Sequence, residues 1–315
     1  MVDYFIYKLK KGELTGGGPR KKSNEAVFVA HSFNTEGNDF RIKLEQEIKR
    51  IPSLSKIDVL DGRVPIGKSW PTEIRERLRK SRVIIADLTV LSSEVLFECG
   101  FAWGLGKPIL PVTRKVDSHG LMPRWLTDLQ IGNLSFDKGW NDLINSLGHH
   151  ISEIHKKRRK APSDSANPSS VVILKSNSSL SLIEDQVRQM AMRFGMEVQY
   201  EDTLFDTLEG TTSELVAQVA HCSLLVAPLL NQLSDSFVHF ACGVVGSVPK
   251  TGVSKRKLSR RILLVVNSVN ETECLPADSA RRMSGVIRII TPQQLCQELT
   301  KYGQLFTTWQ KRQRD

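Results

Sequence analysis

The chain has 315 residues, 40% of them hydrophobic and 25% charged, which is ordinary for a globular protein of about two domains. Five cysteines, with no C-x-x-C pair and no His/Cys cluster at metal spacing, indicate neither a disulfide framework nor a metal site. No apolar stretch is long enough to span a bilayer and no signal peptide opens the chain, so we expect a cytoplasmic protein with no membrane partner.

The net charge of +10 favours anionic partners such as nucleotides, nucleic acid or an acidic protein. Most Lys and Arg residues are scattered, however, and the basic run at 156–160 has no interleaved aromatic residues. Nucleic acid is therefore a conceivable partner that the pattern does not favour, and a small nucleotide suits the charge better.

Residues 1–25 form a basic, Gly-rich segment to which we assign no chemistry. Beyond it, short apolar strands alternate with amphipathic helices. Strands are expected at 26–30, 57–60, 83–86, 108–112 and 134–136, and helices at 39–51, 71–81, 94–105 and 140–154. This alternation predicts a parallel sheet with helices on both faces, whose ligands bind beyond the carboxyl ends of the strands.

A solvated linker is expected at 156–169, and the chain beyond it repeats the first half. Glu73–Ala86 aligns with Glu214–Ala227, and Val95–Gly100 aligns with Val238–Gly243 after a two-residue insertion. The fold class is therefore predicted to be α/β, with two flavodoxin-like units at 26–155 and 170–315.

Three carboxylates of the first unit align with different kinds of residue in the second unit. Asp61 aligns with Asp202 at the offset of the helix, whereas Asp87 becomes Pro228 and Glu98 becomes Ala241. The second unit is therefore expected to be a degenerate, inactive copy.

The most informative residue is Glu98, in the helix expected at 94–105. It shares a stripe with Val95, Cys99 and Ala102, where the helical spacing calls for an apolar residue. A carboxylate there must be paired, solvated or shifted in pKa, and such groups concentrate at functional sites. The alternative is a structural Glu tied to an Arg or a backbone amide.

Gly62–Ser69 matches the phosphate-loop pattern G-x-x-x-x-G-K-S. Against this interpretation, Pro65 removes an amide from the loop, and Trp70-Pro71 interrupts the passage from the lysine into the helix. The loop also follows the second strand of the unit, where the first would be usual. An NTPase is thus an unfavoured alternative.

Two blocks carry a resemblance to a known superfamily. Asp61-Gly62-Arg63 leads into a helix that ends at Ser81-Arg82, and Phe97-Glu98-Cys99-Gly100 is followed by Gly106-Lys107-Pro108. Residues 26–150 resemble the superfamily joining TIR domains and nucleoside 2-deoxyribosyltransferases, with an echo over 170–310. Glu94 departs from it, since similar proteins often have Asn there.

The resemblance implies two catalytic carboxylates. Glu98 would attack or stabilise the anomeric carbon as an N-glycosidic bond breaks, and Asp87 would handle the proton of the base. This fits the chemistry, because bond cleavage develops oxocarbenium character that a carboxylate stabilises. The TIR-like character of the upstream block favours hydrolysis over base exchange.

Substrate contacts are expected from the loops at the same edge of the sheet. Ser32 and Arg63 or Lys68 suit ribose and phosphate, although Ser32 could instead cap a helix and the two cations could simply be solvated. Trp70 suits stacking on a base. The full set of substrate-binding candidates is His31, Ser32, Phe33, Asp61, Gly62, Arg63, Lys68, Trp70 and Ser93.

We therefore expect an N-glycosidic hydrolase acting on NAD or a related nucleotide, with NAD as substrate and no separate cofactor. The resemblance implies a homo-oligomer and a role in bacterial defence. The rival interpretation is a non-enzymatic nucleotide-sensing or scaffold module, and a deoxyribosyltransferase is a further alternative.

Overall fold

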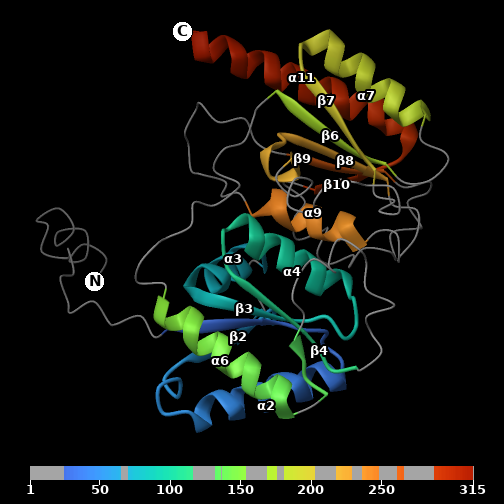
Figure 1. The fold of residues 1–315 in the computed structure, drawn as a ribbon. Coiled ribbons are helices and arrows are strands. Elements are labelled where there is room, and N and C mark those ends of the chain that lie inside the picture. Colours follow the sequence, from blue (N-terminus) through green and yellow to red (C-terminus); the bar gives the residue numbers. More distant parts are fainter. Residues whose placement is uncertain are drawn as a thin grey trace, which may run out of the picture.

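A computed structural model describes residues 25–64, 70–115, 132–135, 137–153, 169–175, 181–202, 218–228, 236–247, 261–265 and 287–314. The predicted N-terminal segment at 1–24 and nearly all of the predicted linker at 156–169 lie outside these residues. Figure 1 shows two sheets with helices around each, and α4 and α9 lying between them.

The first unit consists of five described strands and four described helices. These are β1 (Ala26–Ala30), α2 (Thr35–Arg50), β2 (Asp58–Asp61), α3 (Trp70–Lys80), β3 (Ser81–Asp87), α4 (Ser93–Gly104), β4 (Ile109–Thr113), β5 (Gly132–Asn133) and α6 (Asp137–Glu153). The strands are all parallel, in the order β2-β1-β3-β4-β5.

The second unit has the same strand order. Its described elements are β6 (Ser170–Lys175), α7 (Ser181–Phe194), β7 (Glu197–Asp202), β8 (Leu224–Pro228), α9 (Ser236–Gly246), β9 (Arg261–Val265), β10 (Ile287–Ile290) and α11 (Pro292–Arg314). The sheet reads β7-β6-β8-β9-β10 and is again parallel. The predicted fold class, two flavodoxin-like α/β units, is confirmed.

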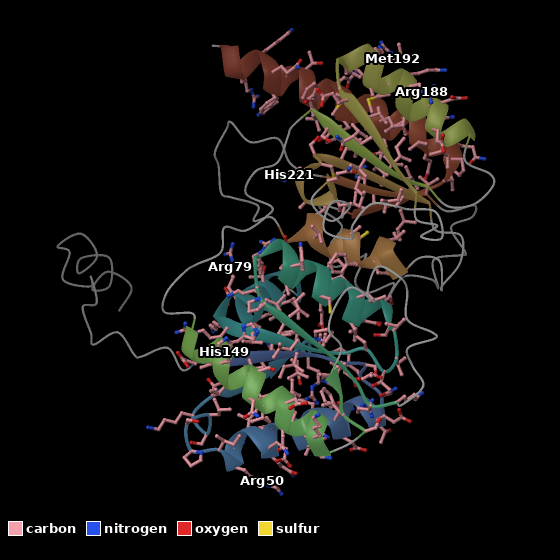
Figure 2. All side chains as sticks on the ribbon, viewed as in Figure 1. Arg50, Arg79, His149, Arg188, Met192 and His221 are labelled. Carbon is pink, nitrogen blue, oxygen red and sulfur yellow. The ribbon has the colours of Figure 1, made fainter. Side chains whose placement is uncertain are left out.

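Helices cover both faces of each sheet. In the first unit, α2 and α6 pack on the face of β1 that carries Val27 and Val29, and α3 and α4 pack on the face that carries Phe28 and Ala30. In the second unit, α7 and α11 cover one face of β6, and α9 covers the other. Polar ends such as those of Arg50 and Arg79 point away from these layers (Figure 2).

Several predicted boundaries differ from the structure, including the start of α6, which lies at Asp137 and not at residue 140. Two more differences concern α2 and β5. The helix expected from residue 39 begins at Thr35, because the Asn34 side chain accepts a hydrogen bond from the amide of Gly37 and caps it. The strand expected at 134–136 lies at 132–133, where Gly132 pairs with Val112.

The strand register also corrects one alignment of the repeat. Val27 and Val171 occupy equivalent places beside β3 and β8, and their partners on the other side are Val59 and Val198. Asp61, two residues after Val59, is therefore equivalent to Tyr200 and not to Asp202.

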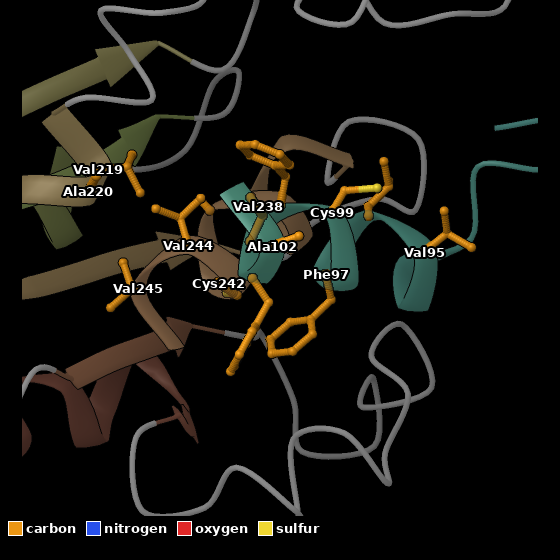
Figure 3. Packing of buried hydrophobic residues seen from close by; sticks show 14 of the residues in the cluster. Val95, Phe97, Cys99, Ala102, Val219, Ala220, Val238, Cys242, Val244 and Val245 are labelled. Carbon is orange, nitrogen blue, oxygen red and sulfur yellow. The ribbon is translucent and has the colours of Figure 1, made fainter. Parts of the chain in front are cut away.

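The two units meet where α4 crosses α9. A Cβ at Gly100 would overlap the carbonyl oxygen of Phe240, and a Cβ at Gly243 would overlap that of Phe97. Side chains from both helices then form one buried cluster, which also includes residues of β1 and β6 (Figure 3). The two units thus share a core through two closely approaching helix backbones.

Among the helices of the described residues, none is both long and apolar enough to cross a membrane.

The crossing predicts opposite effects for two glycine substitutions. Gly100→Ala should lower the free energy of unfolding by about 1–3 kcal/mol, because its methyl group meets backbone that has to move. Gly148→Ala in α6 should raise it by about 0.5–1 kcal/mol, because no described atom lies within 4 Å of the added Cβ and alanine favours a helix. Urea unfolding measures both, and shifts of the same sign would contradict the packing.

Candidate functional site

The carboxyl edge of the first sheet gathers most of the predicted site residues. Asp61 ends β2, His31 follows β1, and Asp87 ends β3. Because β1 lies between β2 and β3, these groups stand side by side at the edge where parallel α/β sheets bind ligands. Glu98 reaches the same edge from α4, as its contact with Gly62 shows.

Glu98 is a buried carboxylic acid. Its side chain lies in α4 with only 2% of the residue exposed, and its Oε2 atom has no hydrogen-bond partner in the described part of the chain. Burial raises the pKa of Glu98 well above its ordinary value, Asp61 and Glu94 raise it further by like-charge repulsion, and Arg77 opposes them. The unpaired acid therefore holds its proton more tightly than an ordinary glutamate.

Gly62 makes room for this acid. A Cβ at position 62 would overlap Oε1 of Glu98 and would lie 3.0 Å from Cζ of Phe33. Only a residue without a side chain allows the Glu98 carboxyl and the Phe33 ring to meet the backbone here. The structure places Gly62, a predicted substrate-binding residue, against the Glu98 carboxyl, a contact that the sequence pattern did not indicate.

Asp61 is the centre of a cationic cluster. Its Oδ2 atom accepts from Nε of Arg63 at 2.9 Å and lies 2.9 Å from Nε of Arg41, while Nη1 of Arg77 is 3.7 Å from Oδ1. The amide of Arg63 also donates to Oδ1, and Nε2 of His31 lies 3.9 Å from Oδ2.

The groups around Asp61 decide its ionisation. Burial by itself raises the pKa of Asp61, but His31 and Arg63 outweigh it and hold this pKa well below its ordinary value. Asp61 is therefore ionised in the folded protein near neutral pH. The pKa of the neighbouring Glu98 shifts in the opposite direction, upwards.

Phe33 and His31 form the aromatic side of the site. Their rings meet edge to face with centroids 5.2 Å apart, and Nδ1 of His31 is 2.9 Å from the carbonyl oxygen of Ser32. His31 is buried, but Phe33 is 45% exposed. Phe33 therefore brings a solvent-facing ring to the position where the Glu98 carboxyl meets Gly62.

Asp87 is tied into an ion pair. Its Oδ1 atom accepts from the amide and the hydroxyl of Thr89, and its Oδ2 atom lies 3.2 Å from Nε and 3.0 Å from Nη2 of Arg114. Both carboxylate oxygens are thus engaged. The predicted catalytic role of Asp87 stays a prediction, and its contacts are those of a carboxylate that holds Arg114 in place.

The remaining predicted residues lie at the margins of the site. The Ser32 hydroxyl donates to Oδ1 of Asn34 at 3.0 Å, so it supports the residue that caps α2 and does not cap the helix itself. Ser93 begins α4, and its hydroxyl donates to Oε2 of Glu94 at 3.3 Å. Lys68 lies outside the described residues, as does the side chain of Trp70 at the start of α3.

Three arginines of the site have no sequence signal that singles them out. Arg41 and Arg77 sit in ordinary amphipathic helices, and Arg114 follows β4. Their roles arise because helices α2 and α3 and strand β4 bring them to Asp61 and Asp87. The described residues contain no group of three or more His, Cys, Asp or Glu side chains that could hold a metal ion.

No protein-family model and no curated protein matches the sequence. A diflavin flavoprotein A3 from Nostoc sp. is 16% identical, covering 47% of this chain and 98% of its own, with a TM-score of 0.34. NAD+-bound 3-phosphoglycerate dehydrogenase from Entamoeba histolytica is 14% identical, covering 85% of this chain and 80% of its own, with a TM-score of 0.22. Likenesses this low carry no functional argument, so the site has to be interpreted from its own chemistry.

The buried acid predicts a pH-dependent gain in stability for Glu98→Gln. Above pH 4.5 the unfolded chain releases the Glu98 proton, whereas the folded protein keeps it. The stability of the wild type therefore falls as the pH rises from 4.5 through the raised pKa of Glu98 in the folded state. The glutamine variant avoids this loss and should gain about 1–3 kcal/mol towards neutral pH.

Urea unfolding between pH 4 and pH 8 measures this gain. Glu76→Gln, at an exposed position of α3, is the matched control and should stay within about 0.5 kcal/mol of wild type. A Glu98→Gln difference that does not change with pH would show that Glu98 is not a buried acid.

Asp61→Asn should change the free energy of unfolding in the opposite direction and lower it. Because the pKa of Asp61 is lowered in the fold, its stabilisation is complete above the ordinary value of 3.8 and is lost as pH falls below it. At neutral pH the variant should lose about 1–3 kcal/mol, less than a fully buried ion pair would, since Arg63 is half-exposed. Asp58→Asn on the exposed part of β2 is the control, and an equal loss there would contradict the cluster.

Proposed function

We propose that the first unit hydrolyses the N-glycosidic bond of NAD or a closely related nucleotide, with Glu98 as the carboxylate that faces the anomeric carbon. The observation that carries this proposal is the buried Glu98 carboxyl with an unpartnered oxygen at the ligand-binding edge of the sheet. A carboxyl group left without a partner costs stability, and sites of catalysis are where proteins retain such groups.

The chemistry needs one carboxylate at this place. The bond between the anomeric carbon and the base nitrogen breaks, its electron pair leaves with the base, and positive charge develops on the sugar. A carboxylate beside the carbon stabilises that charge, and water then adds its oxygen to the carbon and releases a proton.

The engagement of Asp87 favours a cationic leaving group. Both oxygens of Asp87 are occupied by Thr89 and Arg114, so this carboxylate is poorly placed to give a proton to a base. Nicotinamide in NAD is already cationic and leaves neutral without a proton, whereas a nucleoside base needs one. The contacts of Asp87 therefore support NAD over a deoxynucleoside as substrate.

The surroundings of Glu98 supply contacts for the rest of a nucleotide. Arg63 is half-exposed and anchored to Asp61, which leaves its guanidinium edge open to solvent next to the site. The exposed ring of Phe33 offers a surface for the flat base. Both features suit an anionic, aromatic ligand.

The rival hypothesis is a nucleotide-sensing or scaffold module in which Glu98 pairs with a basic neighbour. In the described part of the chain, the arginines of this site pair with Asp61 and Asp87, and no ion pair involves Glu98. This distribution of charges supports the enzyme over the scaffold. Self-association and a role in defence stay predictions that rest on the resemblance, and a cytoplasmic location stays a prediction from the sequence pattern.

The test is release of free nicotinamide from NAD, measured by chromatography of the reaction mixture. Wild type should release nicotinamide and ADP-ribose, and Glu98→Gln should lower the rate at least about a hundredfold because it removes the charge that stabilises the transition state. The rate should rise with pH through the raised pKa of Glu98, since the carboxylate is the reactive form.

Glu76→Gln serves again as the charge-matched control and should keep the full rate. Equal release by wild type and Glu98→Gln, including none, would contradict the proposal, and binding of NAD without turnover would favour the sensing module. Deoxynucleosides in place of NAD test the transferase. Magnesium-dependent phosphate release from ATP, abolished by Lys68→Ala, would favour the phosphate loop.

A further inference from the structure

The crossing of α4 and α9 is reciprocal. A Cβ at Gly100 meets the backbone of Phe240, and a Cβ at Gly243 meets the backbone of Phe97. Gly100 and Gly243 occupy the same place in the repeat, as do Phe97 and Phe240. The two helices therefore meet as the two halves of a symmetric dimer would, although both belong to one chain.

The contact extends along both helices. Gly104 and its repeat equivalent Ser247 face each other, since a Cβ at Gly104 would overlap the Ser247 hydroxyl. From α3, Nη2 of Arg75 donates to the carbonyl oxygen of Gly246 at 3.4 Å, and its guanidinium lies 5.8 Å from the centroid of the Phe101 ring. The second unit is thus fixed to the two helices that flank the site.

The backbone atoms that Gly243 meets lie on either side of Glu98 in the sequence. They are the carbonyl group of Phe97, one residue before Glu98, and the amide nitrogen of Phe101, three residues after it. At this place α4 has α9 against its backbone and Gly62 against the Glu98 carboxyl. Densely packed backbone contacts of this kind leave little freedom for the helix to shift.

We propose that α9 of the second unit positions Glu98 against Gly62, and that Gly243 and Phe240 are the positioning residues through which the second unit acts on the site. The degenerate copy then has a defined task. It holds the helix that carries the acid, in the place that a second subunit would take in a dimer. The catalytic part of this inference rests on the proposed function, but the position of Glu98 does not.

The proposal is tested in the full-length chain by two substitutions in α9. Gly243→Ala places a methyl group against the backbone around Glu98 and pushes α4 away. Phe240→Leu loosens the shared cluster without a clash, and it keeps the test valid where Gly243→Ala does not fold. Both change residues that lie more than a hundred positions from Glu98 in the sequence.

Matched controls come from the far side of the second unit. Gly303→Ala in α11 overlaps the Phe194 ring, and Phe306→Leu trims a buried side chain of the cluster between β6 and α11. These variants strain or loosen the second unit by the same chemistry but touch no residue of α4. They separate a loss of stability from a loss of position.

The first readout is the titration of Glu98, which needs no substrate. The charged groups acting on it are Asp61 from β2, Arg77 from α3 and Glu94 from α4, and none of them is changed. Each α9 variant, each control variant and the wild type is compared with the same protein carrying Glu98→Gln in addition. The difference in unfolding free energy within each of these pairs is measured as a function of pH. This stability difference develops over the pH range in which Glu98 loses its proton. In Gly243→Ala and Phe240→Leu, that range should move by about one pH unit towards 4.5, which is a tenfold change in the proton affinity of Glu98.

The second readout is turnover of NAD. Gly243→Ala should lower kcat about tenfold to a hundredfold and leave KM within about twofold, because a small displacement of the acid affects the transition state more than binding. Gly303→Ala and Phe306→Leu should keep the kcat and the Glu98 titration of wild type. If the α9 variants titrate like these controls, the positioning role is overturned. If wild type shows no turnover but the titration shifts as expected, the proposed function fails and the positioning role stands.

Discussion

The approach of two helix backbones at Gly100 and Gly243 is the constraint on which the rest of the structure depends. Each glycine lies against a main-chain carbonyl of the other helix, so the helices are closer than any side chain would allow. This approach merges the apolar faces of two sheets into one cluster, which contains residues of β1 from one sheet and of β6 from the other. The crossing also determines where α4 stands, and with it the only acid on the buried stripe of that helix.

Among the described residues at the edge of the first sheet, the arginine side chains contact only one of two neighbouring carboxyl groups, that of Asp61 and not that of Glu98. Asp61 takes the contacts of Arg41, Arg63 and Arg77, and His31 and Arg63 lower its pKa against the effect of burial. Glu98 is left in an apolar helix next to that negative charge, and its pKa rises. Environments that push two titratable groups in opposite directions are typical of acid–base and glycosidic chemistry.

The same reasoning separates Glu98 from Asp87, the two carboxylates to which the resemblance assigns catalytic roles. Asp87 ends a strand and is held by Arg114 and Thr89, so its burial is compensated. Glu98 has no such compensation among the described residues. Under the proposed function, the positive charge that develops on the sugar would supply the missing compensation to Glu98. The occupied oxygens of Asp87 direct the proposal towards NAD, whose leaving group needs no proton.

The sequence by itself determined the fold class and the repeat, and it singled out Glu98 as a carboxylate on an apolar helical stripe. Apolar strands alternating with amphipathic helices are local patterns, and a period of about 141 residues is visible in the chain alone. Helix starts were misjudged where one side chain decides them, as Asn34 does for α2. The offset of β2 was misjudged by two residues, because a shift of two keeps every side chain on its face of the sheet.

Only the tertiary structure decided which groups meet. Gly62 suggested a phosphate loop in the sequence, but its missing side chain admits the Glu98 carboxyl. Arg41 and Arg77 became part of the site, and Gly243 came to lie against the backbone of Phe97 and Phe101, on either side of Glu98 in the sequence. Such contacts depend on how helices from distant parts of the chain pack on the sheets, and no local pattern of spacing or polarity encodes them.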